Sequence, residues 1–279
     1  MKQILITGSE GFIGKRLADF LESKGYLINR FDLVNDGADF PKISQCDVVI
    51  HLGANSSTTE KNLKKILKQN FEFSKKLFEL CASKGIKFQY ASSASVYGNS
   101  ETFNEIDFCK PLSPYALSKY MFDCWLLNQT YAYQGFRYFN VYGLGENKKG
   151  EQASPVYKFI KQAQIKKEIV LFEKSENYIR DFVCIDDICE IHEKMINIDK
   201  SGVFNIGTGK PISFRDVANI VQDYIPCDIK EIPMPKIFEG QYQKFSKANN
   251  EKLINIIGEF KWKTVNQYVK ENLSKLMDL

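Results

Sequence analysis

The sequence predicts an α/β protein whose first domain, residues 1–142, is built on a doubly wound parallel sheet. Short apolar runs of strand length alternate there with longer segments of helical periodicity. Repeated strand–helix–strand units form parallel sheets with helices on both faces. Beyond Gly143 the loops lengthen and prolines cluster at 226, 233 and 235, which indicates a smaller mixed α/β domain at 143–279. We expect some return of the chain to the first domain around 178–198.

The elements follow in order from these patterns. In the first helix, FIGKRLADFLESKG at 12–25, apolar residues recur at helical spacing and Gly25 ends the pattern. Two more helices are expected in this domain, at about 64–84 and in SPYALSKYMFDCWLLNQTYA from Ser113. The five expected strands are QILIT, YLINRFD, DVVIHLGA, KFQYASS and GFRYFNVYG. In the second domain, helices near 155–165, 213–224 and 248–257 are separated by short strands.

Composition and charge are ordinary for a soluble globular protein. Of the 279 residues, 44% are apolar and 26% are charged, and the net charge is only +4. Lysines and acidic residues are interspersed, without the basic block that follows a phosphate backbone. We therefore expect no nucleic acid partner.

Cysteine usage and the start of the chain exclude further classes. Seven cysteines show no C-x-x-C spacing and there are only two histidines, so we expect reduced thiols and no metal site. One of the two, His51, is expected to pack at a strand end rather than to act in catalysis. The apolar stretch in MKQILITGSEGFIG is too short for a signal peptide, and no 18-residue apolar run occurs. We expect a cytoplasmic protein without a membrane partner.

The glycine-rich segment GSEGFIG predicts a dinucleotide site. It places Gly8, Gly11 and Gly14 between a strand and a helix, where the chain must turn tightly and let a pyrophosphate approach the backbone. The helix N-terminus then faces the phosphates with its partial positive charge. Asp32 ends the next strand and can accept hydrogen bonds from both ribose hydroxyls, which favours NAD over NADP. We expect a Rossmann-type cofactor domain, with a purely structural turn as the alternative.

A Tyr–Lys pair one helical turn apart is the candidate catalytic centre. SPYALSK places Tyr115 and Lys119 on one helix face, and Ser93 ends a preceding strand. A nearby ammonium lowers the pKa of a phenol from about 10, so Tyr115 could take a proton from a sugar hydroxyl that Ser93 holds. Any amphipathic helix can contain such a pair. Together with the glycine segment, however, these residues resemble the extended short-chain dehydrogenase/reductase superfamily, in which the lysine also binds the nicotinamide ribose.

Four further stretches narrow this resemblance. They are GANSSTTE (53–60), GFRYFNVYG (135–143), VLFEKSENYIRDFV (170–183) and GQYQKFSKAN (240–249). They closely resemble the ADP-L-glycero-D-manno-heptose 6-epimerases, bacterial enzymes that supply the heptose of lipopolysaccharide. The resemblance implies a homo-oligomeric nucleotide-sugar epimerase with a tightly bound NAD or NADP. Such an enzyme inverts C6 of an ADP-heptose by transient oxidation to a 6-ketone.

The loop KKGEQAS at 148–154 supplies a second acid/base by the same resemblance. The family's lysine in a K-G-x-x-A-S segment aligns with Lys149, and Lys148 is its solvated neighbour. The chemistry gives a reason for this lysine: once the ketone has turned about the C5–C6 bond, its oxygen has left Tyr115 and needs another proton donor. Without the resemblance, the loop would be taken for an ordinary charged surface loop.

The resemblance also assigns binding residues. Arg180 fits a diphosphate because a guanidinium forks onto phosphate oxygens, with an ion pair to Asp181 as the alternative. Tyr242 would close over the diphosphate or the sugar. The expected cofactor contacts are Gly8, Gly11, Phe12, Ile13, Gly14, Asp32, Leu33, Leu52, Gly53, Ala54, Asn55, Ser56 and Lys119. The expected substrate contacts are Ser93, Asn140, Val141, Glu151, Lys158, Phe172, Glu173, Lys174, Ser175, Arg180 and Tyr242.

The sequence departs from the family pattern in two regions. Glu151 stands where the family has a serine and Lys158 where it has a histidine, so a different heptose or a different nucleotide base stays open. Leu33 replaces an asparagine that serves NADP, and the segment between Asp32 and Asp47 is too short for the usual additional strand and helix. These changes favour NAD, although the family tends to use NADP.

Other functions remain as alternatives. They are another nucleotide-sugar epimerase or a reductase of the superfamily, a 4,6-dehydratase, and a non-catalytic nucleotide-binding regulator. A dehydratase needs acidic residues directly after the active-site serine, where this chain has Ala94 and Ser95. A reductase would consume reduced cofactor stoichiometrically. A regulator would be expected to have lost Tyr115, Lys119 or Ser93, and all three are present.

Overall fold

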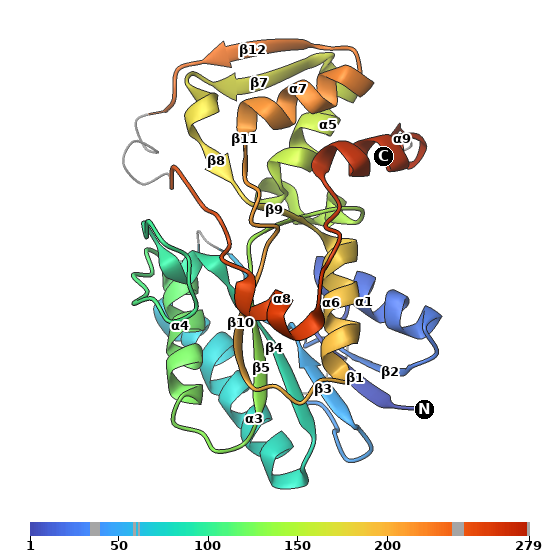
Figure 1. Cartoon of the computed structure of the whole chain (residues 1–279), viewed down its shortest axis with the longest axis vertical. Helices are drawn as coiled ribbons and strands as arrows, with labels where there is room; N and C mark the ends of the chain where they lie inside the picture. The colour runs from blue at the N-terminus through green and yellow to red at the C-terminus, as the bar shows by residue number, and fades with distance from the viewer. Residues whose placement is uncertain (34–39, 58–59, 61, 236–242, 278–279) are drawn as a thin grey trace.

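A computed structural model of the chain describes residues 1–33, 40–57, 60, 62–235 and 243–277. Two lobes lie one above the other in Figure 1. The larger lobe holds a six-stranded sheet with the N-terminus, and the smaller lobe holds short strands, several helices and the C-terminus. This arrangement confirms the α/β class, the Rossmann-type sheet and the smaller mixed α/β part.

The six-stranded sheet is entirely parallel and has the order β10-β5-β4-β3-β1-β2. From β1 the chain moves to one side with β2 and to the other side with β3, so the order reverses at β1. Ligands of open α/β sheets bind at the carboxyl ends of the strands beside such a reversal. The strands are β1 (Gln3–Thr7), β2 (Leu27–Phe31), β3 (Val48–His51), β4 (Lys87–Ser93), β5 (Tyr133–Tyr138) and β10 (Gly202–Ile206).

Helices cover both faces of this sheet, and the alternation of side chains in the strands decides which residues each face buries. In β1, Ile4 and Ile6 pack with Leu17 and Leu21 on one side, whereas Leu5 packs with Phe78 on the other. The first face carries α1 (Phe12–Ser23) and α6 (Ile185–Ile196), and the second carries α2 (Leu63–Leu67), η1 (Lys68–Glu72), α3 (Phe73–Lys84) and α4 (Pro114–Leu126).

Two predicted elements differ in detail from the structure. The helix expected at about 64–84 is present as α2, η1 and α3 in succession, but η1 is a π-helical segment that sequence periodicity does not reveal. The strand GFRYFNVYG is divided at Phe139. Its first part, β5, pairs with β4 and β10, while its second part, β6 (Asn140–Tyr142), pairs with β9 (Phe182–Cys184) and thereby leads into the smaller lobe.

The smaller lobe is built around its own core of buried apolar residues, to which α5, α7 and α9 contribute. Its other two-stranded sheets pair β7 with β12 and β8 with β11. The elements are η3 (Glu146–Gln152), α5 (Pro155–Lys166), β7 (Glu168–Phe172), η4 (Ser175–Asn177), β8 (Ile179–Arg180), β11 (Ile212–Ser213), α7 (Phe214–Tyr224), β12 (Asp228–Ile232) and α9 (Val265–Met277). The chain also returns to the larger lobe as α6, β10 and α8 (Glu251–Ile257), and the short η2 (Ala94–Tyr97) follows β4.

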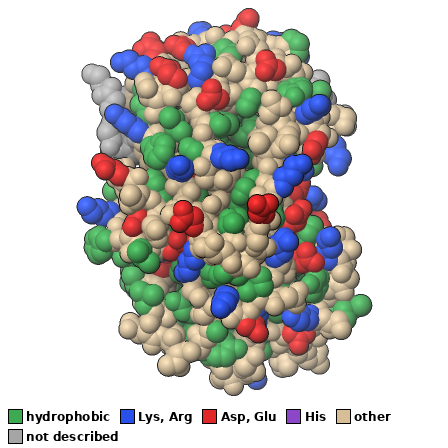
Figure 2. Space-filling model, viewed as in Figure 1, with side chains coloured by type: hydrophobic (Ala, Val, Ile, Leu, Met, Phe, Trp, Pro, Cys, Tyr) green, Lys and Arg blue, Asp and Glu red, His purple; other side chains and the backbone are tan. Residues whose placement is uncertain are grey.

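The surface carries charges of both signs. Figure 2 shows lysine, arginine and acidic side chains interspersed over both lobes, and on this face the described side chains form no continuous field of one sign. Among the helices of the described residues, none is long and apolar enough to cross a bilayer.

Candidate active site

A cavity of about 490 Å³ lies at the carboxyl ends of the strands beside the reversal of strand order. Every residue predicted for the cofactor lines it: Gly8, Gly11, Phe12, Ile13, Gly14, Asp32, Leu33, Leu52, Gly53, Ala54, Asn55, Ser56 and Lys119. Tyr115 and Lys149 line it as well. Lining residues that were not predicted include Lys65, Gln69, Phe73 and Tyr138, which come from elements whose approach to the cavity depends on tertiary packing.

The glycine turn brings three segments of backbone together at one end of this cavity. Gly8 has φ +70, and a Cβ there would lie 2.6 Å from the backbone nitrogen of Gly53. The cap of α1 is Gly11, and in this fully described turn no side chain caps the helix and no acidic residue stands in the first turn. The N–H groups at the start of α1 are therefore open to an anionic group. These features fit the pyrophosphate of a dinucleotide.

A buried asparagine holds the segment around Asn55, which lines the cavity. Asn70, in the π-helical η1, accepts a hydrogen bond from the Asn55 N–H (2.7 Å) and donates to the Asn55 carbonyl (3.0 Å). Its amide also donates to Ser118 Oγ (3.0 Å), which in turn donates to the Tyr115 carbonyl. Asn70 was not predicted as a site residue. The signal that could have indicated it is its position as a polar residue on the buried face of the expected helix. The contact couples the cofactor wall to the helix of the Tyr–Lys pair.

The Tyr–Lys pair lies at the start of α4, as predicted. Ser113 caps this helix by accepting a hydrogen bond from the Ala116 N–H (3.1 Å), which fixes the first turn on which Tyr115 stands. Ser93, at the end of β4, lies beside the Tyr115 hydroxyl. Lys119 Nζ donates to the carbonyl of Ala91 (2.7 Å). The structure thus brings the three predicted catalytic residues of the larger lobe together.

The pKa of Tyr115 is raised in the structure, whereas the sequence predicted that it would be lowered. Burial raises the pKa of Tyr115, and the neighbouring Ser93 hydroxyl opposes this increase. The ammonium of Lys119 is hydrogen-bonded to a backbone carbonyl, and its charge does not offset the effect of burial on Tyr115. Burial also lowers the pKa of Lys119 to about 8, while the carboxylate of Asp123 one turn further along α4 raises it. The positive nicotinamide ring, when bound, would supply further charge that favours the phenolate.

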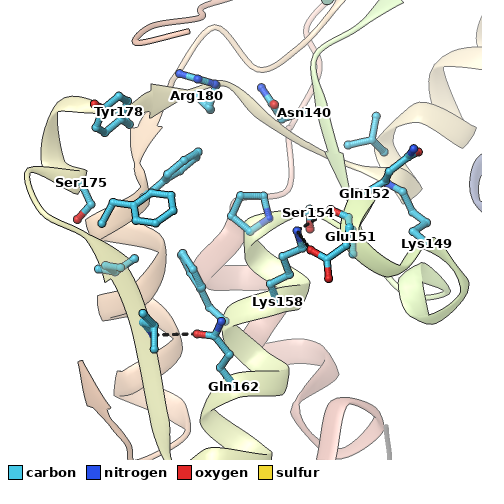
Figure 3. Close-up of a pocket in the computed structure, with 18 of the residues that line it drawn as sticks. Asn140, Lys149, Glu151, Gln152, Ser154, Lys158, Gln162, Ser175, Tyr178 and Arg180 are labelled. Atoms are coloured by element: carbon cyan, nitrogen blue, oxygen red, sulfur yellow. Dashed lines mark hydrogen bonds and ion pairs between the residues drawn. The ribbon is translucent and has the colours of Figure 1, made fainter. Parts of the chain in front are cut away.

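A second cavity, of about 640 Å³, lies in the smaller lobe next to the first (Figure 3). The predicted substrate residues that line it are Asn140, Val141, Glu151, Lys158, Phe172, Ser175 and Arg180. Other lining residues were not predicted and include Ser154, Phe159, Gln162, Tyr178, Phe214 and Gln243. Aromatic rings gather at one end of this cavity, around Ser175 and Tyr178, while Glu151, Lys158 and Lys149 lie at the other.

Three predicted substrate contacts are placed differently. The side chains of Glu173 and Lys174 are exposed and do not line the cavity, because they stand in the turn between β7 and η4, where Lys174 has φ 61. Of the four neighbours at 172–175, only Phe172 and Ser175, at the two ends of the turn, line the cavity. Ser93 lies beside Tyr115 rather than in the lining of the second cavity. Tyr242 is outside the described residues.

Arg180 and Ser175 are buried polar residues of the second cavity. Arg180 donates to the carbonyl of Ile179 (2.9 Å) and to that of Gln243. Asp181, its alternative partner, accepts hydrogen bonds from another part of the chain, namely Thr208, Gly209 and Ala248. The hydroxyl oxygen of Ser175 is buried and has no hydrogen-bond partner among the residues that the structure describes. A bound ligand in the cavity would satisfy such a group.

Of the described residues that line the two cavities, Lys149 is common to both. Its ammonium lies 4.6 Å from the centre of the Phe12 ring and 3.5 Å from the carboxylate of Glu146. Burial lowers the pKa of Lys149, and Glu146 opposes that effect. The neighbouring Lys148 is exposed, as the sequence suggested. Lys149 is therefore placed to contact a ligand in either cavity.

His51 lies behind the cofactor cavity and outside its lining. Its ring is hydrogen-bonded to the hydroxyls of Thr7 (2.6 Å) and Ser74 (2.7 Å). Burial, with a smaller effect from Lys119, lowers the pKa of His51 to about 3. The ring is therefore neutral at physiological pH and ties β1 and β3 to α3.

Known proteins match the chain over nearly its entire length. The model of the NAD dependent epimerase/dehydratase family matches residues 4–207. The chain is 36% identical to the ADP-L-glycero-D-manno-heptose-6-epimerase of Brachyspira hyodysenteriae, with 90% of each chain covered. The Helicobacter pylori ADP-L-glycero-D-manno-heptose-6-epimerase superposes with a TM-score of 0.88 at 28% identity, over 100% of this chain and 97% of that one. The UDP-N-acetylglucosamine 4-epimerase of Methanobrevibacter ruminantium gives a TM-score of 0.83 at 25% identity, over 98% and 99%.

Proposed function

Because the chain belongs to the NAD-dependent epimerase/dehydratase family, we propose that it is a nucleotide-sugar epimerase that inverts C6 of an ADP-glycero-manno-heptose. The observation that carries the proposal is the position of Lys149, which borders both cavities, where inversion at C6 needs a second acid/base besides Tyr115. The relationship to the heptose epimerases supports this substrate. The redox step would use the residues of the first cavity, and the nucleotide would occupy the second.

The reaction at C6 needs two proton-transfer groups. A carbon that carries only a hydroxyl has no acidic proton, so inversion requires oxidation to a ketone and reduction on the opposite face. The nicotinamide cofactor, when bound, would accept the hydride and return it. Tyr115 takes the proton from the C6 hydroxyl, which Ser93 holds, and Lys119 binds the nicotinamide ribose. After rotation about C5–C6 the oxygen has moved away from Tyr115, and Lys149 donates the proton.

The second cavity offers partners for each part of the nucleotide sugar. The aromatic rings of Phe172, Tyr178 and Phe214 suit the faces of a purine, and Ser175 supplies a hydroxyl for its edge. Arg180 suits the diphosphate. Asn140, at the start of β6, lies at the side of the cavity towards Lys149 and would contact the sugar.

We expect NAD to be preferred over NADP because Asp32 lines the cofactor cavity at the carboxyl end of β2. A 2′-phosphate would face its carboxylate. The variant Asp32→Asn is expected to improve the affinity for NADP relative to NAD by about tenfold or more. Titration of the cofactor-free protein with both dinucleotides measures the ratio. The exposed Asp199→Asn is the charge control and should leave the ratio unchanged; tight binding of NADP by the unaltered protein would contradict the preference.

Proton NMR of ADP-D-glycero-D-manno-heptose incubated with the protein, without added reductant, tests the activity. We expect a mixture with the L-glycero epimer. Lys149→Met should slow its formation by about 10²- to 10⁴-fold, the usual contribution of a general acid. Lys148→Met is the matched control, because this neighbouring lysine is exposed and should leave the rate unchanged.

An unchanged NMR spectrum with bound cofactor would contradict the proposed substrate. The second candidate is then epimerisation of another nucleotide sugar, and one observation favours it. Lys158 Nζ donates to the Glu151 carbonyl (2.6 Å) and lies 3.7 Å from the Glu151 carboxylate. This charged pair lies at the end of the cavity nearest Lys149, at positions where the heptose epimerases have a histidine and a serine, so the cavity differs there from theirs. A panel of nucleotide sugars under the same conditions would identify the substrate.

A further inference from the structure

The loop between β6 and α5 folds around a buried carboxylate. Glu146 is only 1% exposed. Its carboxylate accepts hydrogen bonds from the N–H of Gly143 (3.1 Å), the N–H of Ser154 (2.6 Å) and the hydroxyl of Ser154 (2.8 Å). Burial of an ionised group costs free energy unless it is paired and hydrogen-bonded, and here three donors are aimed at one carboxylate. Glu146 therefore fixes both ends of the loop.

The backbone of the loop is adapted to this arrangement. Gly145, with φ 99, directs the chain inward immediately before Glu146, and Gly150, with φ 51, divides the helical segment η3. Ser154 also caps α5 by accepting a hydrogen bond from the Tyr157 N–H (3.2 Å). The carboxylate is thus attached to a helix start and to a strand end, which are rigid parts of the lobe.

The remaining partner of the carboxylate is the ammonium of Lys149, at 3.5 Å. The ammonium also lies over the ring of Phe12, which lines the cofactor cavity. A lysine has several rotatable bonds and is ordinarily mobile, so these two contacts together restrict its position.

We propose that Glu146 is the positioning residue of Lys149, holding its ammonium at the boundary of the two cavities through a buried ion pair. The inference rests on the proposed acid/base role of Lys149. It assigns Glu146 no contact with substrate or cofactor, since Glu146 does not line either cavity.

The charges around the pair determine what the loss of Glu146 would do. Burial lowers the pKa of Lys149, Glu146 raises it, and Lys158 on α5 lowers it. Tyr157 of α5 and Tyr268 of α9 also face Glu146, but burial and nearby charges raise the pKa of both phenols, so they are neutral below pH 9. Without the carboxylate, two effects that lower the pKa of Lys149 are left unopposed. Lys149 would then lose its proton at a lower pH.

Competitive labelling with a trace amount of an amine-acylating reagent tests this in the holoenzyme without substrate. All proteins in the experiment carry Lys148→Gln. Lys149 is then the only lysine between Asn147 and Lys158, so mass spectrometry of the loop peptide reports the labelling of Lys149 alone. In Glu146→Gln, which keeps one acceptor oxygen but removes the charge, we expect Lys149 to be labelled about fivefold faster near pH 8. The exposed Glu259→Gln is the charge control and should not change the labelling.

Labelling of Lys149 that is unchanged in Glu146→Gln, with cofactor content and melting temperature preserved, would overturn the proposal. If Glu146→Gln does not fold, the labelling of Lys149 in Glu146→Asp tests the proposal instead. Glu146→Asp keeps the charge but moves it away by one methylene, and a smaller increase in labelling is expected, whereas no increase counts against the proposal.

The pH profile of the epimerase reaction provides a second readout that a merely structural role would not move. Because Lys149 must be protonated to donate, the alkaline limb of the kcat profile should lie at lower pH in Glu146→Gln. The labelling needs no substrate, so its result stands even if the heptose is not the substrate. Conversely, faster labelling in Glu146→Gln combined with full activity of Lys149→Met would contradict the acid/base role of Lys149, while the ion pair between Glu146 and Lys149 would still be supported.

Discussion

Tyr115→Phe is expected to lower kcat for epimerisation by about 10³-fold while KM and the melting temperature stay nearly unchanged. The substitution removes the phenol hydroxyl that lies beside Ser93 at the cofactor cavity, but it keeps the ring and its packing. The start of α4 does not depend on the hydroxyl, because the side chain of Ser113 caps it. Loss of kcat without loss of binding is the signature of an interaction made only in the transition state.

The matched control is Tyr120→Phe, on the same helix. Tyr120 lines neither of the two cavities and packs instead with the buried cluster that contains Val96 and Phe103. Its hydroxyl should therefore be dispensable, with kcat within about twofold of the unaltered protein. If Tyr115→Phe retained a tenth or more of kcat, another group would have to be the base.

The predicted cofactor contacts all line one cavity because they stand where local patterns end. The glycine turn, Asp32 and the segment after β3 each follow a strand, and carboxyl ends of neighbouring parallel strands meet at one edge of the sheet. The pairing of distant strands is not encoded locally. No pattern near β5 indicates that its outer neighbour is β10, or that the chain changes sheet at Phe139.

The residues that tune the site were not predicted, for a common physical reason. Asn70, Asp123 and Glu146 are polar residues in segments that resemble an amphipathic helix or a charged loop, and whether such residues are buried is decided by tertiary packing. Asp123 did have a signal, since it lies one turn beyond Lys119 on the same helix face. For Glu146 the two glycines of its loop were the only indication of an unusual backbone.

Asp123→Ala is expected to lower the free energy of unfolding by about 3–5 kcal/mol. The Asp123 carboxylate accepts hydrogen bonds from Arg137 Nε (3.0 Å), the Tyr90 hydroxyl (2.8 Å) and the Ser92 hydroxyl (3.0 Å). Both members of the Arg137–Asp123 ion pair are nearly inaccessible to solvent, at 4% and 3% exposure. Removal of the carboxylate leaves a guanidinium buried without its counter-charge. Urea denaturation followed by circular dichroism measures the change.

Asp199→Ala is the matched control for this measurement. Asp199 also pairs with a cation, Lys87 Nζ at 3.4 Å, but its side chain is fully exposed, so its loss should not change the unfolding midpoint measurably. A double variant, Asp123→Leu with Arg137→Met, should recover much of the stability because no charge is then buried alone. Equal midpoints for Asp123→Ala and Asp199→Ala would show that the buried pair contributes nothing.

Asp123→Ala should also change the pH dependence of catalysis. Asp123 is the charge that raises the pKa of Lys119, while burial lowers it to about 8. In Asp123→Ala the pKa of Lys119 should fall further, so a larger fraction of this lysine is neutral at pH 8. A neutral amine still donates a hydrogen bond to the ribose but no longer favours the Tyr115 phenolate. The alkaline limb of the kcat profile should therefore move to lower pH in the folded fraction, an effect that a loss of stability alone would not produce. The double variant keeps this shift while regaining stability, because it too lacks the carboxylate near Lys119.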